Sequence, residues 1–299
     1  MAKRLLALGW IVLVLMPPAP AGEGPAVRRD VPDDDRMFRP TVKVRKKDSQ
    51  GSGTVIASVA GETLILTAAH VVEGSGPLWI ELHRYNLGVE KAELQGAWPL
   101  ALGAEVVATD PAGDLAVIRL RGHPPLPYVA RLAPGDEEPS RGSEVTSIGI
   151  DGGTHLSSWR TEVGGVAWIA MHKGAGDRPF LVLRKPPQHG RSGGGLFRAD
   201  GSLVGVCVGR IEILERNRHL GLFASSASIR RMLRDHDLDG AIVRSETAPV
   251  RIIPPGRPTA RSAVTPTRAK PSRRGHEEGA ATRPSVPGAG GGSLSKSGR

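Results

Sequence analysis

The sequence predicts an all-β fold, built as barrels or as a sandwich, and three observations support this prediction. Short segments rich in β-branched and aliphatic residues recur along the chain, each bounded by Gly, Pro, Asp or Asn. No long helical pattern lies between these segments, as is typical of barrels and sandwiches. A section with five prolines, residues 121–139, divides the segments into two series.

The individual elements follow from this pattern. The first series predicts strands at residues 41–45, 53–58, 63–67, 78–83, 105–109 and 115–120. The second series predicts strands at residues 144–150, 162–169, 180–183, 203–208 and 220–224. One helix is expected at residues 226–236, because Ile229, Met232 and Leu233 fall on one face. Residues 22–246 suffice for one large all-β unit or two small barrels.

The N-terminal residues have the pattern of a secretory signal peptide. Lys3 and Arg4 precede an apolar run at residues 5–16, which is followed by small residues and prolines. This run is shorter than the roughly 20 apolar residues needed to span a bilayer. We therefore expect a signal peptide at residues 1–21, cleavage after Ala21, and export to the periplasm or the medium. The acidic, proline-containing residues 22–39 are expected to form a flexible leader.

The composition changes sharply near residue 247. Residues 247–299 consist mainly of Pro, Gly, Ser, Thr, Ala and Arg, so they cannot bury enough apolar surface to offset the entropy of ordering. This predicted disordered tail holds ten Lys and Arg against two Glu, a net charge of +8 out of +10 for the chain. The basic charge therefore predicts no nucleic-acid-binding domain. A solvated tail of this kind can contact anionic surfaces weakly.

A candidate nucleophile lies at residues 190–197, which read Gly-Arg-Ser-Gly-Gly-Gly-Leu-Phe. Ser192 sits on a turn made almost entirely of glycine, which allows close approach of a ligand to the main chain. The N–H groups of Gly190 and Ser192 could converge on an oxyanion there. Runs of Gly and Ser are also ordinary linkers. This run is followed by an apolar strand at residues 203–208, so we interpret it as a catalytic turn.

Two upstream residues complete the pattern of a catalytic triad. His70 follows the apolar strand at residues 63–67, and Asp114 directly precedes the strand at residues 115–120. A serine hydroxyl needs a base to take its proton, and the base needs a third group to orient it. Alone, each residue has an ordinary structural interpretation, as a turn histidine or a strand-leading aspartate. Together, in the order His, Asp, Ser, they predict a triad.

The sequence resembles the trypsin-like serine endopeptidases of the chymotrypsin fold, nearest to the HtrA (Deg) branch. The resemblance rests on residues 51–56, 67–72, 110–120, 190–196 and 200–206. It implies two six-stranded Greek-key barrels, at about residues 40–125 and 140–235, within a protease domain at residues 40–246. The active site would lie in the cleft between the barrels, and one helix would follow them. HtrA proteins usually carry a PDZ domain after the protease, for which residues 247–299 are too few.

The resemblance also implies a substrate site. The strand after the nucleophile would form one wall of a pocket for a modest apolar side chain, with Val206, Cys207, Val208 and Gly209 contributing to it. His189 would either line the same site or be an exposed loop residue.

Three positions depart from the family pattern. Pro186 stands where trypsin keeps a pocket aspartate, so cleavage after Lys or Arg is not expected. Gly195 replaces a proline and is expected to loosen the turn. Arg191 stands where HtrA relatives carry Asn and the digestive enzymes carry an Asp that binds a newly cut N-terminal amine. A guanidinium would repel that amine. We expect Arg191 to point to solvent or to reach a carboxylate or carbonyl.

The remaining chemistry-bearing residues predict no cofactor. The single cysteine, Cys207, cannot form an internal disulfide and is expected to pack as a small apolar residue. The histidines lack metal-binding spacing, so we assign no metal and no other cofactor. The expected partner is a protein or peptide substrate.

Three functional hypotheses remain open at this point. The first is an exported serine endopeptidase with the triad His70, Asp114 and Ser192. The second is a catalytically silent protease-fold binding protein, suggested by Arg191 and Gly195. The third is a serine esterase, against which the lack of a strand–Gly-x-Ser-x-Gly–helix elbow argues.

Overall fold

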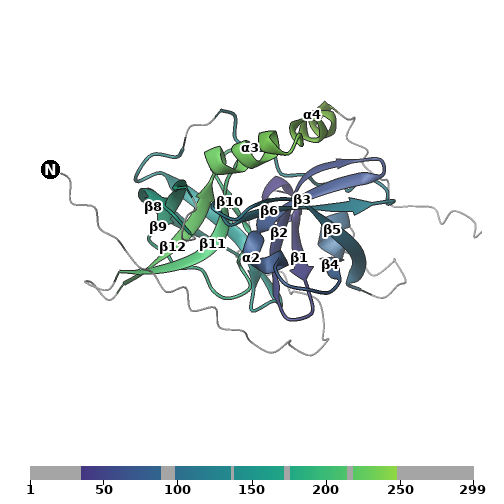
Figure 1. The fold of residues 1–299 in the computed structure, drawn as a ribbon, viewed down its shortest axis with the longest axis horizontal. Coiled ribbons are helices and arrows are strands. Elements are labelled where there is room, and N and C mark those ends of the chain that lie inside the picture. Colours follow the sequence, from purple (N-terminus) through teal and green to yellow (C-terminus); the bar gives the residue numbers. More distant parts are fainter. Residues whose placement is uncertain (1–34, 89–97, 136–137, 172–175, 214–217, 248–299) are drawn as a thin grey trace, which may run out of the picture. The chain divides into compact units, whose positions relative to one another are not determined.

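The computed structural model describes residues 35–88, 98–135, 138–171, 176–213 and 218–247. The predicted signal peptide, residues 22–34 of the predicted leader, and residues 248–299 of the predicted tail lie outside the described residues. Two closed antiparallel barrels of six strands lie side by side, with two helices along one side of both (Figure 1). This arrangement confirms the predicted all-β, two-barrel fold.

The first barrel closes in the strand order β1-β2-β3-β6-β5-β4. Its strands are β1 Thr41–Arg45, β2 Gln50–Val59, β3 Glu62–Ala68, β4 Leu78–Leu82, β5 Leu100–Asp110 and β6 Leu115–Arg121. A one-turn helix, α2 (Ala69–Val72), follows β3, and a 3-10 turn, η1 (Arg84–Leu87), follows β4. Closure leaves no free strand edge in the ring.

The second barrel repeats the neighbour order of the first, because it closes as β10-β11-β12-β9-β8-β7. Its strands are β7 Glu144–Asp151, β8 His155–Ile169, β9 Arg178–Leu183, β10 Gly195–Phe197, β11 Leu203–Ile213 and β12 Arg218–Ser225. The loop from β9 to β10 therefore corresponds in topology to the segment from β3 to β4. The first of these carries Ser192 and the second carries His70.

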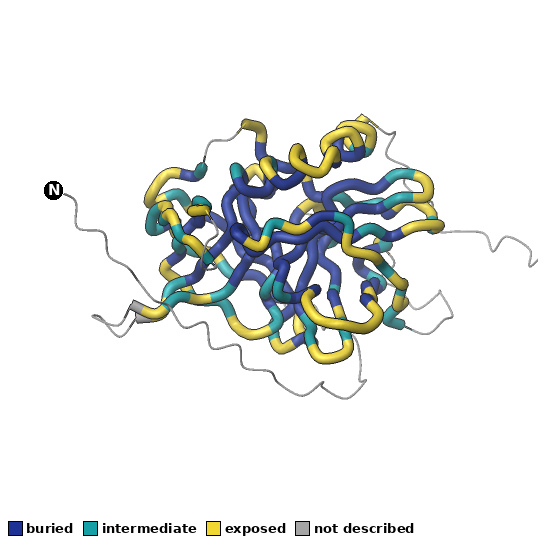
Figure 2. The backbone as a smooth tube through the Cα atoms, viewed as in Figure 1, coloured by how far each residue is buried: buried dark blue, intermediate teal, exposed yellow. Residues whose placement is uncertain are grey.

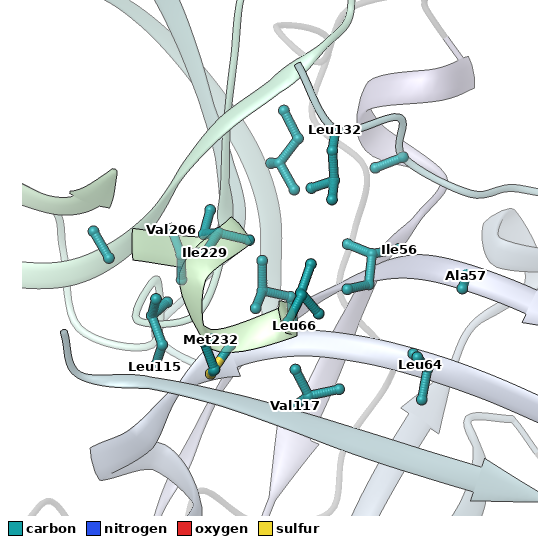
Figure 3. Close-up of a cluster of buried hydrophobic side chains, with 14 of the residues drawn as sticks. Ile56, Ala57, Leu64, Leu66, Leu115, Val117, Leu132, Val206, Ile229 and Met232 are labelled. Carbon is teal, nitrogen blue, oxygen red and sulfur yellow. The ribbon is translucent and has the colours of Figure 1, made fainter. Parts of the chain in front are cut away.

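Each barrel has its own apolar interior, and a third cluster joins the two. Strand β3 shows how: Ile65 packs inside the first barrel, while Leu64 and Leu66 point to the opposite face. There Leu66 belongs to the same buried cluster as Val206 of the second barrel (Figure 3). Buried residues are concentrated in the strands of both barrels, and exposed residues in the loops and on the outer sides of the helices (Figure 2).

The helices differ from the prediction of one C-terminal helix. In the described part of the chain, α3 (Ser226–Asp235) is followed by α4 (Asp239–Thr247), so the expectation is corrected to two. Helix α4 has no strong apolar periodicity and is held by tertiary contacts. Its Ile242 is buried in the cluster between the barrels, and the Ser58 N–H donates to Ser245 Oγ at 2.9 Å.

Two further elements escaped the sequence analysis. Residues Asp35–Phe38, at the end of the predicted leader, form the short helix α1, in which Met37 and Phe38 are buried. Strand β10 begins at Gly195, within the glycine run, and pairs with β7 and β11. A Cβ at Gly195 would lie 2.6 Å from the Phe197 ring. Gly195 therefore packs closely in the sheet and does not loosen the turn.

Candidate active site

His70 is positioned by the end of β3 and by the first barrel's interior. It lies in α2, where its neighbours Val71 and Val72 are buried in the apolar interior. These contacts hold the helix turn, and the His70 side chain stays 25% exposed at the surface. The imidazole is therefore fixed at its base and open at its tip.

Asp114 holds the other end of the His70 side chain. Its carboxylate accepts the His70 backbone N–H at 2.9 Å and meets His70 Nδ1 at 2.6 Å. A carboxylate can only accept, so Nδ1 carries the proton and Nε2 keeps its lone pair. Asp114 adopts a φ of 49°, a left-handed conformation that is strained for a non-glycine residue. The turn is held because the Ala112 N–H donates to Asp110 Oδ1 at 3.1 Å.

The electrostatic environment makes His70 a stronger base. Burial of the ring alone would lower its pKa, but the hydrogen bond with Asp114 and the charges of Asp114 and Glu73 outweigh that effect. The net result is a pKa of His70 raised above its ordinary value of 6.5. A base of this kind can take a proton from a nearby hydroxyl and hold it.

Ser192 is half-buried in the loop between β9 and β10. Its carbonyl accepts the Ser52 N–H at 2.7 Å, which ties the loop to β2 of the other barrel. A Cβ at Gly51 would lie 2.8 Å from that carbonyl oxygen and 2.7 Å from a Val71 methyl. Gly51 therefore marks the point where the loop of Ser192 and the helix turn of His70 meet.

The Ser192 hydroxyl is not engaged by His70 in this structure. It donates to the Val208 carbonyl at 3.3 Å, and within the described residues neither Ser192 Oγ nor His70 Nε2 has a hydrogen bond to the other. Catalytic hydrogen bonds are often long in the absence of substrate. Rotation about the Ser192 Cα–Cβ bond moves the hydroxyl without any change in the backbone.

The two amide N–H groups predicted for an oxyanion hole are free and have fixed directions. Within the described residues, neither the Gly190 N–H nor the Ser192 N–H has a hydrogen-bond partner. The carbonyl that shares a peptide plane with the first, that of His189, accepts the Gly152 N–H at 2.7 Å. The carbonyl that shares a plane with the second, that of Arg191, accepts the Gly194 N–H at 2.8 Å. In a trans peptide the N–H points opposite to the carbonyl, so each N–H direction is set.

The predicted substrate-binding residues differ in their exposure to solvent. Val206 and Cys207 are fully buried in separate apolar clusters, so a substrate cannot reach their side chains. Burial also raises the pKa of the Cys207 thiol to about 12, so the thiol is inert. His189 is exposed, Gly209 is half-buried, and Val208 contacts the nucleophile through its carbonyl.

Two interactions near the site escaped the sequence analysis. Ser52 Oγ accepts the Ile150 N–H and donates to the Gly190 carbonyl, both at 2.8 Å, and so links the nucleophile loop to β7. Arg191 is fully buried and pairs with Asp151. The expectation of a solvent-exposed Arg191 is thus wrong, and the alternative, a carboxylate partner, is correct. Neither contact has a local sequence signal, because β7 lies far away along the chain.

In the described ranges, no group of three or more His, Cys, Asp or Glu could hold a metal ion. In those ranges, too, no helix is long and apolar enough to cross a membrane.

Residues 51–206 match the family of the trypsin-like peptidase domain. The chain is 30% identical over 167 residues to the serine protease Do-like HtrA of Bacillus subtilis, an overlap that covers 54% of this chain and 33% of that protein. It is 26% identical over 169 residues to the serine protease Rv3671c of Mycobacterium tuberculosis, covering 55% of this chain and 37% of that one. The chain thus spans about a third of the length of these relatives.

Solved structures share the fold. The active form of the Rv3671c protease superposes with a TM-score of 0.53 at 20% identity, covering 74% of this chain and 93% of that one. An inactive form of the same protease gives a TM-score of 0.51 at 22% identity, with 67% and 90% covered.

Proposed function

This chain belongs to the trypsin-like peptidase family, and on that premise we propose that it is an exported serine endopeptidase acting through an acyl-enzyme. One observation carries the proposal. Asp114 accepts a hydrogen bond from His70 Nδ1, which leaves Nε2 as the acceptor, and the loop of Ser192 carries two N–H groups that have no partner within the described residues. This set of groups matches the needs of acyl transfer: a nucleophile, an oriented base and donors for an oxyanion.

The first half of the reaction forms the acyl-enzyme. Ser192 Oγ attacks the carbonyl carbon of the scissile peptide bond, and its proton passes to His70 Nε2. The negative charge that develops on the carbonyl oxygen is bound by the N–H groups of Gly190 and Ser192. Asp114 stabilises the imidazolium. The C–N bond then breaks, and the leaving amine takes the proton from His70.

The second half restores the enzyme. A water molecule gives a proton to His70 and attacks the acyl carbon, and the same two N–H groups bind the second oxyanion. The proton returns to Ser192 Oγ as the acid product leaves. His70 acts as base and then as acid in each half, which its raised pKa supports.

The substrate is proposed to be an extended segment of a protein or peptide. Val208 and Gly209 offer main-chain groups beside the nucleophile, and exposed His189 can contact the substrate from the other side. Pro186 supplies no carboxylate for a Lys or Arg side chain. We therefore propose cleavage after small or medium apolar residues, with no cofactor.

Export is proposed from the basic start, short apolar run and small-residue end of residues 1–21. N-terminal sequencing of the protein recovered from a periplasmic fraction or from the medium tests it. A new terminus at Gly22 is expected, and a retained Met1 would contradict the proposal.

The activity is tested by labelling with a fluorophosphonate probe, which reacts with an activated serine. The wild type should be labelled and Ser192→Ala should not, with both proteins folded by circular dichroism. A folded wild type that takes no label would favour the silent binding protein. Hydrolysis of casein compared with a small ester then separates the endopeptidase from the esterase.

A further inference from the structure

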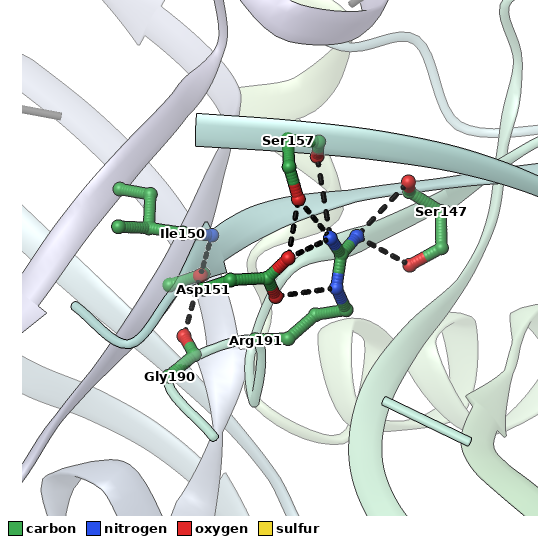
Figure 4. Close-up of polar contacts among 7 residues, drawn as sticks. Ser147, Ile150, Asp151, Ser157, Gly190 and Arg191 are labelled. Atoms are coloured by element: carbon green, nitrogen blue, oxygen red, sulfur yellow. Dashed lines mark hydrogen bonds and ion pairs between the residues drawn. The ribbon is translucent and has the colours of Figure 1, made fainter. Parts of the chain in front are cut away.

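Arg191, the residue directly before the nucleophile, is the largest fully buried side chain in the described structure. Its guanidinium forms a two-pronged ion pair with Asp151, through Nε to Oδ1 at 2.9 Å and Nη2 to Oδ2 at 2.7 Å (Figure 4). Nη1 donates to the Ser147 carbonyl at 3.0 Å and to Ser147 Oγ at 3.2 Å. Nη2 also donates to Ser157 Oγ, which in turn donates to Asp151. Each guanidinium nitrogen thus has an acceptor.

Neighbouring residues pack closely around the Arg191 side chain. The Trp159 ring lies under the guanidinium, with Cζ 5.0 Å from the ring centre. Strand β7 carries Gly149 at the point of closest approach, where a Cβ would lie 2.8 Å from Arg191 Cγ. The side chain therefore extends from the nucleophile loop across the face of the paired strands β7 and β8 of the second barrel.

Stability alone does not explain such a pair. Taking two charges out of water is costly, and apolar residues of similar volume are often as good or better for stability. A charge pair that lies directly beside the candidate nucleophile and is not explained by stability therefore points to a role in geometry. The neighbouring main chain shows which geometry is held.

The turn that begins at Asp151 fixes both donors of the candidate oxyanion hole. The Asp151 carboxylate holds the Arg191 side chain, and Arg191 contributes the carbonyl behind the Ser192 N–H. Gly152, the next residue of the turn, donates its N–H to the His189 carbonyl behind the Gly190 N–H. The ion pair of Arg191 and Asp151, called the clamp below, therefore ties the nucleophile loop to the turn at residues 151–152. This is where the peptide planes of the Gly190 and Ser192 N–H groups are held.

We propose that Arg191 and Asp151 are positioning residues that hold the oxyanion hole in its working geometry through a charge pair internal to the second barrel. The proposal rests on the proposed function, since an oxyanion hole matters only to an acyl-transfer enzyme. Both charges come from side chains, so no terminal amine is needed to assemble the hole.

The test separates positioning from folding with three variants. Arg191→Met removes the cation and leaves Asp151 unpaired. Arg191→Met/Asp151→Leu replaces both charges by apolar groups, which is expected to preserve the fold. Arg119→Met is the matched control, because Arg119 pairs with Glu62 at 2.8 Å on the first barrel, away from the nucleophile loop.

The kinetic readout is a split between kcat and KM for a fluorogenic peptide. In the double variant we expect kcat to fall by about 10²–10³-fold, the loss typical of a damaged oxyanion hole, with little change in KM. The affinity for a peptide aldehyde, whose adduct places an oxyanion in the hole, should fall in parallel. Arg191→Lys keeps the positive charge but loses the two-pronged geometry. Its kcat should therefore lie between that of the double variant and that of the wild type. Arg119→Met should behave as the wild type.

A second readout does not depend on activity. Amide hydrogen exchange, followed by mass spectrometry, should rise for a peptide covering residues 188–195 in the double variant and stay unchanged in Arg119→Met. A folded double variant with wild-type kcat and wild-type exchange would overturn the proposal. If the double variant does not fold, Arg191→Lys is measured instead, because it loses the two-pronged contact with Asp151, and a wild-type kcat and wild-type exchange there would also overturn it. A wild type without activity would refute the proposed function. The comparison of hydrogen exchange between the wild type and the double variant would still show whether the Arg191–Asp151 pair holds the nucleophile loop.

Discussion

Two arginine–aspartate pairs hold the turns that carry Asp114 and Ser192, and the two pairs differ in where they lie. Arg178 of β9 binds Asp110 at the start of the Asp114 turn, with Nε to Oδ2 at 3.0 Å. This pair crosses from one barrel to the other, and both side chains keep some contact with solvent, at 15% and 12% exposed. The pair of Arg191 and Asp151 lies within the second barrel; its arginine is fully buried, while Asp151 is 14% exposed, so the two pairs differ in the burial of the arginine.

This difference indicates that the two pairs have different structural roles: the first aligns the two barrels, and the second holds a local turn. A partly hydrated pair between barrels can align two bodies, and it tolerates loss because water replaces the missing partner. A pair inside one barrel fixes a local turn, and loss of its aspartate leaves the fully buried guanidinium without a carboxylate or water. The proposed base His70 and its proposed orienting acid Asp114 belong to the first barrel, so they depend on alignment. The proposed oxyanion donors, the N–H groups of Gly190 and Ser192, belong to the second barrel, so they depend on the Arg191–Asp151 pair.

The largest expected effect is the loss of activity when the proposed nucleophile is removed, and the effects of changes in the two ion pairs are compared with it. Ser192→Ala should lower kcat by about 10⁶-fold, as is typical when a member of a triad is removed. Adding His70→Ala should cost little more, because nucleophile and base act as a unit. Single-turnover kinetics on a fluorogenic peptide measure both losses. A double variant far below Ser192→Ala would show that His70 serves another step.

The next largest effect is on the free energy of unfolding, which allows the two ion pairs to be compared directly. Asp151→Ala leaves the Arg191 guanidinium buried and unpaired, so we expect a loss of about 3–5 kcal/mol in the free energy of unfolding. Asp110→Ala is the matched variant, for which we expect about 1–2 kcal/mol, because Arg178 can be rehydrated. Urea unfolding followed by tryptophan fluorescence measures both. Equal losses would remove the distinction between the two pairs.

These two predictions also mark how far sequence reasoning reaches. His70, Asp114 and Ser192 could be proposed because each stands beside a recognisable local signal, in a known order: His70 follows an apolar strand, Asp114 directly precedes one, and Ser192 lies on a glycine turn. Their contacts to the barrel ends are local, and local contexts are visible in a sequence. The single helix predicted after the barrels was incomplete for the converse reason: α4 has no pattern of its own and is held by Ile242 and Ser245.

Long-range partners could not be predicted in the same way. Asp151 lies 40 residues before Arg191, and only closure of the second barrel brings them together. Val206 and Cys207 were assigned to a pocket wall, yet successive strand residues face opposite sides, and here both sides of β11 are covered. Which face of a strand is open depends on what packs there.

A smaller effect concerns pH. Neutral His70 is the base, so kcat/KM should fall as the pH drops through a pKa that lies above 6.5. Stability has the opposite sign: the raised pKa favours the folded state below pH 6.5 and this contribution is lost as the pH rises through the folded value. Asp114→Asn should lower the midpoint, since burial of the ring then dominates. Arg178→Met should leave the midpoint unchanged, because Asp110 aligns the turn without raising the pKa of His70. A wild-type midpoint at or below 6.5 would contradict this account.

The smallest expected effect is no effect at all, and it tests whether the internal clamp is sufficient. Proteins that begin at Met1, Gly22, Glu23 and Asp35 should hydrolyse the same unfolded substrate at equal rates. Asp151, the carboxylate that binds the residue directly before the nucleophile, is already paired with Arg191 and is not available to an N-terminal ammonium. Burying a second cation next to the guanidinium would be costly. A shift of the start point should therefore leave kcat/KM unchanged, while Arg191→Met lowers it from every start point. Activity that appeared with only one of these N-termini would mean that a terminal amine completes the oxyanion hole, and that the pair in the second barrel does not hold it alone.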